Sequence, residues 1–119
     1  MQSANLPPIP QDFTRTIAER SFLCRDGSGE HTVCVEFGEP SQDVIVMNGT
    51  DWRCPLRITV GSESTVRSIV GIDSLQALQL AINLARAELE NIAVRPGTAL
   101  IYLDEEVDIS QPNWQSNLL

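Results

Sequence analysis

The clearest pattern of hydrophobic and polar positions runs from residue 52 to residue 60. Apolar residues occupy every second position there: Trp52, Cys54, Leu56, Ile58 and Val60. Strict alternation of this kind is typical of a strand with one face on a hydrophobic core. The opposite face carries Arg53 and Arg57, and we expect it to stay wet. Because proline lacks the N–H that a strand ladder needs, Pro55 predicts that the strand lies at an edge there or starts its pairing after it.

Two segments before this strand predict a β-hairpin. Polar and apolar residues interleave over residues 13–24 and again over residues 31–37, and a glycine-rich stretch separates them. A turn of this composition between two alternating runs is a hairpin signal. Two registers fit the pattern, and they differ in which first-strand residues share the face of Val33 and Val35: Ile17 with Leu23, or Ala18 with Phe22.

Three further segments have strand character. Residues 44–47 are apolar and fit either a short extra strand or a packed loop, followed by a tight turn at Asn48-Gly49. Residues 65–72 predict a strand antiparallel to the alternating one, and residues 99–103 predict a short final strand.

One long helix is predicted over residues 74–92. Apolar residues recur there at steps of three and four, and they form one stripe: Leu75, Leu78, Ile82, Ala85, Leu89 and Ile92. Neighbouring apolar positions widen the stripe, which suits a helix that lies across a sheet. Asp73 or Ser74 is placed to cap the helix N-terminus.

These elements predict an α+β fold, with a mostly antiparallel sheet of about four to five strands and one long helix packed on one face. At 119 residues the chain has room for one domain. We expect an extended, proline-rich N-terminal arm over residues 1–12, the domain over residues 13–103, and an acidic and polar tail over residues 104–119.

The charge balance changes the range of expected partners. Sixteen acidic residues against eight arginines give a net charge of −8. Nucleic acids and anionic membranes need a basic surface, so neither is expected as a ligand. A basic protein partner is compatible with this charge. The N-terminus lacks the features of a signal peptide, and no apolar run is long enough to span a membrane, so a cytoplasmic location is predicted.

No residues with the spacing of a catalytic or metal site stand out in the sequence. Cys24, Cys34 and Cys54 form no C-x-x-C pair, and His31 is the sole histidine, so reduced thiols are expected and a metal site is not. Cys54 would need His31 as a base for nucleophilic chemistry, yet its place in the alternating strand makes it a core thiol. No catalytic residue, cofactor or metal is therefore predicted.

The helix start invites a second interpretation. The residues Asp73-Ser74-Leu75 resemble the helix start on which acyl carrier proteins attach phosphopantetheine, with the serine as acceptor. A carrier protein is a small helical bundle, whereas the residues before Asp73 have strand periodicity. The capping role explains the same residues, so Ser74 stands as a modification site only in an alternative hypothesis, that of an acyl-carrier-like or accessory domain.

Two motifs together resemble a known family. Asp51-Trp52-Arg53-Cys54-Pro55 is followed about twenty residues later by Gly71-Ile72-Asp73-Ser74-Leu75-Gln76-Ala77-Leu78. The pair is similar to the signature of a family of small bacterial domains of unknown function. The resemblance covers roughly residues 13–103 and implies strands before a single helix. It implies no activity.

Small size, acidity and the lack of a catalytic constellation together predict a role. These features favour a non-enzymatic module that binds one protein partner, as an immunity protein binds and neutralises a basic bacterial toxin such as a nuclease. The candidate partner-binding residues lie in the tail: Asp104, Glu105, Glu106, Asp108 and Trp114. A structural or regulatory subunit of a larger assembly is a further alternative, and the oligomeric state stays open.

Overall fold

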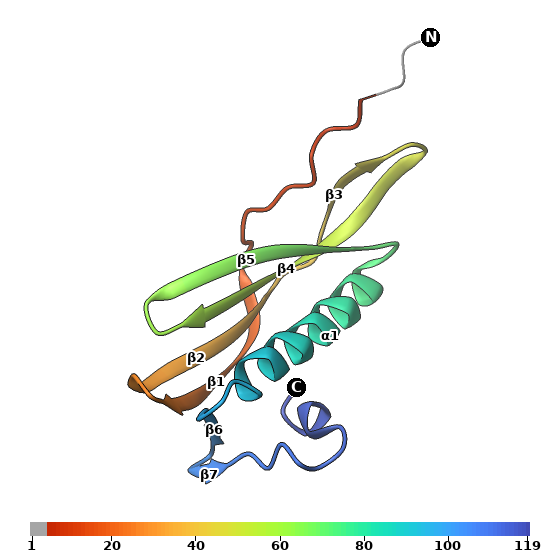
Figure 1. Cartoon of the computed structure of the whole chain (residues 1–119). Coiled ribbons are helices and arrows are strands. Elements are labelled where there is room, and N and C mark those ends of the chain that lie inside the picture. The colour runs from red at the N-terminus through yellow and green to blue at the C-terminus, as the bar shows by residue number, and fades with distance from the viewer. Residues whose placement is uncertain (1–4) are drawn as a thin grey trace.

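The computed structural model describes residues 5–119, so the first four residues of the predicted N-terminal arm lie outside the described residues. An antiparallel sheet carries one long helix on one face (Figure 1). Seven strands make up the sheet within residues 5–119: β1 Thr16–Asp26, β2 Gly29–Gly38, β3 Ser41–Val46, β4 Gly49–Val60, β5 Glu63–Gly71, β6 Ala99–Tyr102 and β7 Glu105–Glu106. The helix α1 spans Ser74–Ala93, and a short 3-10 helix, η1, spans Trp114–Asn117.

The predicted fold class was wrong in its balance of sheet and helix. Seven strands and one long helix within residues 5–119 make the protein mostly sheet, rather than an α+β fold with four to five strands. Two of the strands are short. β3 begins at Ser41 and overlaps the segment 44–47 that fitted either a strand or a loop, and β7 has two residues in the predicted tail. Alternation cannot be recognised over so few positions, and these strands depend on their neighbours for pairing.

β4 organises the sheet because three strands pair with it. β5 runs along one side of it, while the other side pairs with β3 as far as Arg53 and with β2 from Leu56 onward. Pro55 lies between these two stretches. Its missing N–H therefore falls where β4 changes neighbours. The predicted start of pairing after Pro55 is confirmed for β2 but is wrong for β5, which pairs with β4 from Trp52 onward. On the outer side of β2, β1 is followed by β6 and then β7.

The register of the β1–β2 hairpin follows the second of the two predicted alternatives. Phe22 lies opposite Val33, and Ala18 lies opposite Phe37. The core forms between the hairpin, β4 and α1, and its strand residues are buried: Phe22, Cys24, Val33, Val35, Phe37, Cys54, Leu56 and Ile58. The alternating strand therefore faces the core with the predicted side chains.

The helix has the predicted length, and it faces the sheet with the predicted stripe except at Leu75. Its buried residues are mainly small: Ala77, Ala81, Ala85, Leu89, Ile92 and Ala93. Leu75, expected in the stripe, is 60 % exposed. Alanines four residues apart let the helix backbone approach the sheet closely, which turns larger side chains to the flanks. No helix within residues 5–119 is both long and apolar enough to cross a membrane.

Asp73 caps the N-terminus of α1. Its Oδ1 accepts a hydrogen bond from the Gln76 N–H at 2.7 Å, and Gln76 Oε1 accepts one from the Ile72 N–H at 2.8 Å. This reciprocal pair satisfies two backbone donors at the turn between β5 and α1. Two residues before Asp73, the backbone of Gly71 packs against the first helical turn.

We expect Gly71→Ala to lower the free energy of unfolding by about 1 to 3 kcal/mol. A Cβ at this position would lie 2.5 Å from the Ala77 nitrogen and 2.9 Å from the Ala77 Cα, and neither backbone atom can move freely. Denaturant unfolding measures the change. The matched control is Gly27→Ala in the β1–β2 turn, where a Cβ meets nothing within 4 Å. Equal stability of the two variants would contradict the close approach of β5 and α1.

Candidate functional site

The residues after β6 fold back onto the domain, where the sequence predicts a tail. Arg86 Nη2 donates to the carbonyl of Leu119 at 2.6 Å, and Arg20 Nη1 donates to the carbonyl of Leu118 at 2.6 Å. Trp114 is only 6 % exposed and belongs to the hydrophobic core together with Leu118. The predicted aromatic residue of the partner-binding set is therefore anchored in the domain.

An acidic hollow of about 250 Å³ opens in this C-terminal segment. Glu105, Glu106 and Asp108 line it, and Trp114 contributes to its wall. The structure thus brings together four of the five predicted partner-binding residues. The fifth, Asp104, lines a separate hollow. All three lining carboxylates belong to exposed residues, so they present negative charge to solvent.

The turn between β6 and β7 orients the acidic residues. Leu103 and Asp104 have φ values of +52° and +65°, and Tyr102 pairs with Glu105 across the turn. A left-handed backbone is disfavoured for a residue such as leucine, by roughly 1–2 kcal/mol. Leu103 is also 78 % exposed, so burial of its side chain does not compensate for this cost. Strain is therefore retained at the point that turns Glu105 back beside β6.

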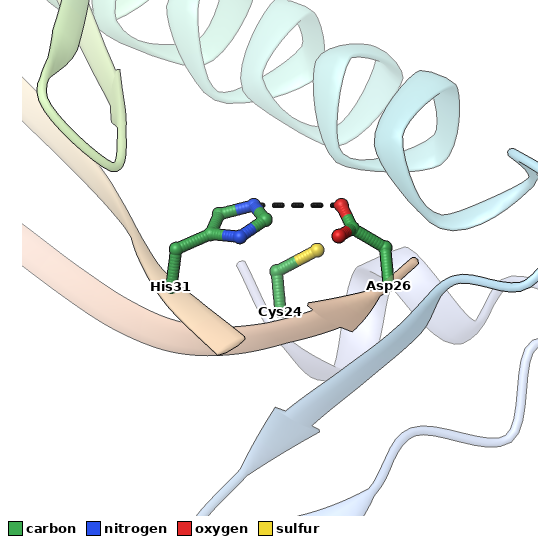
Figure 2. Close-up of side chains that lie close together, drawn as sticks. All are labelled: Cys24, Asp26 and His31. Carbon is green, nitrogen blue, oxygen red and sulfur yellow. Dashed lines mark ion pairs between the residues drawn. The ribbon is translucent and has the colours of Figure 1, made fainter. Parts of the chain in front are cut away.

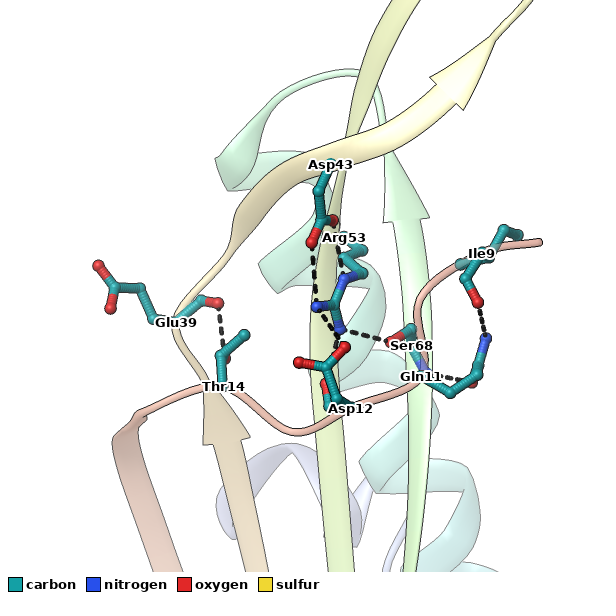
Figure 3. A network of polar contacts seen from close by, with 8 residues as sticks. All are labelled: Ile9, Gln11, Asp12, Thr14, Glu39, Asp43, Arg53 and Ser68. Carbon is teal, nitrogen blue, oxygen red and sulfur yellow. Dashed lines mark hydrogen bonds and ion pairs between the residues drawn. The ribbon is translucent and has the colours of Figure 1, made fainter. Parts of the chain in front are cut away.

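A second polar cluster surrounds Arg53 of β4, which is 1 % exposed (Figure 3). Arg53 Nε and Nη2 donate to the two carboxylate oxygens of Asp43 at 2.8 and 3.1 Å. Its Nη1 donates to the Asp12 carbonyl at 2.7 Å and to the Ser68 hydroxyl at 3.1 Å, and Nη2 also reaches the Asp12 carboxylate. One guanidinium therefore joins β3, β4, β5 and the N-terminal arm.

The expectation that this face of the sheet stays wet was wrong at Arg53. The N-terminal arm crosses the face and covers it (Figure 3). Next to Asp12, the ring of Phe13 stacks on Arg57, with the guanidinium carbon 4.0 Å from the ring centroid. Arg57 also donates to both oxygens of Glu36 at 2.6 and 2.8 Å, which lowers the pKa of that carboxyl. Alternation within one strand carries no information about a distant segment that packs on it.

A third cluster lies at the turn end of the β1–β2 hairpin. Cys24 is directly opposite His31, and Asp26 follows two residues later on the same face. Figure 2 shows the three side chains pointing toward one another, and their potential metal-ligand atoms all lie within 4.8 Å of one another. Asp26 Oδ1 accepts hydrogen bonds from the N–H and the hydroxyl of Ser28, which lower the pKa of the carboxyl. Sequence spacing did not predict this cluster because it depends on the hairpin register.

Cys54 and Ser74 occupy sites that favour architectural roles. Cys54 is fully buried, and burial raises the pKa of its thiol to about 11, so the thiolate is scarce at neutral pH. Its thiol donates to the Gly38 carbonyl at 3.4 Å. Ser74 is exposed in the first turn of α1, where Asp73 provides the cap. The sheet around it differs from the helical bundle of an acyl carrier protein.

The fold and the two motif segments together define a small, sheet-rich domain with a single long helix within residues 5–119. The chain belongs to a family described as a domain of unknown function, DUF6968, whose model matches residues 18–113. Residues 51–55 and 71–78 both lie inside the matched range, and the expected membership of a family of unknown function is confirmed. Neither the curated proteins nor the solved structures contain a match to the chain.

The Arg53 cluster predicts a specific dependence of stability on pH. Hydrogen bonds from Arg53 lower the pKa of Asp43 below its ordinary value of 3.8. The Asp43 carboxyl binds a proton more readily in the unfolded chain than in the folded protein. The contribution of its ionised form to stability is therefore complete above pH 3.8 and is lost as pH falls through the lower pKa of the folded state. We expect Asp43→Asn to lower the free energy of unfolding at pH 7 by about 1 to 2 kcal/mol. This range already allows for the partial solvent exposure of the carboxyl, which weakens the interaction.

Denaturant unfolding at pH 7 and at several values below pH 3.8 measures this effect. The difference between the original protein and Asp43→Asn is expected to shrink toward zero at the acidic end. Asp51→Asn, on the same β3–β4 hairpin, is the control and should leave stability unchanged throughout. A difference for Asp43→Asn that stays constant across the series would show that packing, and not the charge, accounts for it.

Proposed function

We propose that the protein is a non-enzymatic binding module that neutralises one basic protein partner by direct contact, as an immunity protein does to a bacterial toxin. The observation that carries this proposal is the gathering of Glu105, Glu106 and Asp108 around one hollow with Trp114 in its wall. A concave, acidic surface next to an aromatic side chain is suited to an arginine or lysine side chain of a partner.

Charge acts at two distances in this proposal. The net charge of −8 raises the rate at which a basic partner encounters the protein. At contact, the carboxylates of Glu105 and Glu106 accept hydrogen bonds from the partner's cationic side chain, while Asp108, which already accepts hydrogen bonds from Ser110 and Gln111, adds its negative charge. Trp114 is held in the core and does not need to reorder on binding, so its indole forms a rigid part of the wall.

The state of the cysteines supports a role without catalysis. A nucleophilic cysteine needs an accessible thiolate, and Cys54 is fully buried, which raises the pKa of its thiol to about 11. We also propose that the family is bacterial and that its two motifs serve the same role in all its members. In this proposal, the D-W-R-C-P segment at residues 51–55 and the helix start at residues 71–78 build the domain, and the C-terminal segment binds the partner.

The first experiment is an affinity capture from the source organism, with mass spectrometry of the proteins that remain bound after a salt wash. The proposal predicts one stoichiometric basic partner that is toxic when expressed alone and harmless when co-expressed with this protein. If the captured partner is acidic, or if co-expression leaves its toxicity unchanged, the neutralising role is wrong.

The binding surface is tested with a variant that carries Glu105→Gln, Glu106→Gln and Asp108→Asn. Loss of three exposed negative charges at the hollow is expected to slow association with the captured partner by about tenfold or more at low ionic strength, and by less at high salt. Surface plasmon resonance at two salt concentrations measures both rates.

A matched variant separates the local effect from net charge. This variant carries Glu19→Gln, Asp51→Asn and Glu63→Gln, and it loses the same number of negative charges at positions outside the hollow. This control is expected to retain most of the association rate. Equal losses in the two triple variants would mean that only overall charge matters and that the hollow is not the binding surface.

A further inference from the structure

We propose that Cys24, Asp26 and His31 form a binding site for a divalent transition-metal ion, with Zn²⁺ as the best-matched ion (Figure 2). The three side chains offer one sulfur, one carboxylate oxygen and one imidazole nitrogen. This donor set combines the ligand types that zinc uses in proteins, whereas calcium and magnesium prefer oxygen alone. The site is separate from the acidic hollow and does not depend on partner binding.

The spacing of the donor atoms fits an ion between them. Bond lengths to tetrahedral zinc place neighbouring ligand atoms about 3.4 to 3.6 Å apart. Asp26 Oδ2 and His31 Nε2 are 3.8 Å apart, and all three donor atoms fall within 4.8 Å of one another. The Asp26–His31 distance is too long for a direct hydrogen bond. Shifts of about 1 Å or less in partly exposed side chains would bring the donors to bonding distance.

The backbone of the hairpin already fixes the donors. Cys24 and His31 are a directly paired couple in the β1–β2 ladder, and Asp26 is two residues from Cys24, so all three project from the same face. Ser28 holds the other oxygen of Asp26 through hydrogen bonds of 2.8 and 2.6 Å. Support of a ligating carboxylate by outer hydrogen bonds is a regular feature of metal sites, because it orients the free oxygen.

Burial gives the site an inner and an outer side. Cys24 is 1 % exposed, whereas the side chains of His31 and Asp26 are 25 % and 29 % exposed. An ion can therefore enter from solvent past His31 and Asp26 and reach the sulfur at the inner end. Three protein ligands leave a fourth position open to water or to a group from another molecule.

Titration of the reduced, full-length protein with Co²⁺ tests the site directly. Cobalt takes the same ligands as zinc, and a bond to a thiolate produces a sulfur-to-cobalt charge-transfer band in the near ultraviolet. We expect this band at one equivalent of Co²⁺ and its loss when Zn²⁺ is added. Competition with a chromophoric chelator then gives the Zn²⁺ affinity.

Two variants test the ligands His31 and Asp26, and a third tests the outer partner Ser28. His31→Asn and Asp26→Asn change partly exposed positions, and each is expected to weaken Zn²⁺ binding by about a hundredfold or more, since loss of an outer partner alone accounts for about 10 to 100-fold. Ser28→Ala removes such an outer partner and is expected to weaken binding by about tenfold. At a fixed Co²⁺ concentration, the intensity of the charge-transfer band should fall more in His31→Asn and Asp26→Asn than in Ser28→Ala.

The matched control is Cys34→Ser. Cys34 lies on β2 between two core residues and so projects from the opposite face of the hairpin. This variant should keep both the band and the affinity. The proposal is overturned if Co²⁺ gives no charge-transfer band with the original protein. It is equally overturned if Cys34→Ser abolishes the band while His31→Asn retains it.

Discussion

The sheet depends on the burial of one positive charge. A guanidinium removed from water must be surrounded by acceptors, and Arg53 obtains them from segments that are far apart in the sequence, Asp12, Asp43 and Ser68. These contacts hold the N-terminal arm and β5 against β4 at the point where β4 changes neighbours. The D-W-R-C-P segment thus acts on both faces of the sheet, with Cys54 in the core and Arg53 beneath the arm.

Much of the fold follows from local patterns in the sequence. The alternation from residue 52 to residue 60 predicted β4 and the side chains that it buries, because one face of a strand repeats every second residue. The helix also agrees within one residue at its end, since its apolar repeat and the cap at Asp73 are encoded locally. Both signals come from consecutive residues, so neither requires knowledge of the rest of the chain.

The remaining features depend on contacts between distant residues. The buried stripe of α1 is centred on alanines because the helix approaches the sheet closely, whereas the apolar periodicity alone also placed Leu75 in the stripe. The acidic residues of the hollow were recognised from the sequence, but their arrangement around Trp114 was not. The Cys24–Asp26–His31 cluster exists only in one hairpin register, and two registers fitted the pattern. The helix face, the arrangement around Trp114 and the hairpin register are set by contacts between distant residues, and patterns among adjacent residues do not reveal them.

The β3–β4 hairpin extends past the first turn of the helix (Figure 1). Val44 is buried within it but lies outside the main hydrophobic cluster. The outer part of this hairpin, residues 41–51, therefore has little apolar contact to lose, and the Arg53 cluster is its chief attachment, whereas β4 from Trp52 onward belongs to the core. Such a segment opens as a unit at a lower free energy than the whole protein, and its amide hydrogens exchange earlier than those of β1 and β2. We therefore expect residues 41–51 to open locally while the rest of the sheet stays folded.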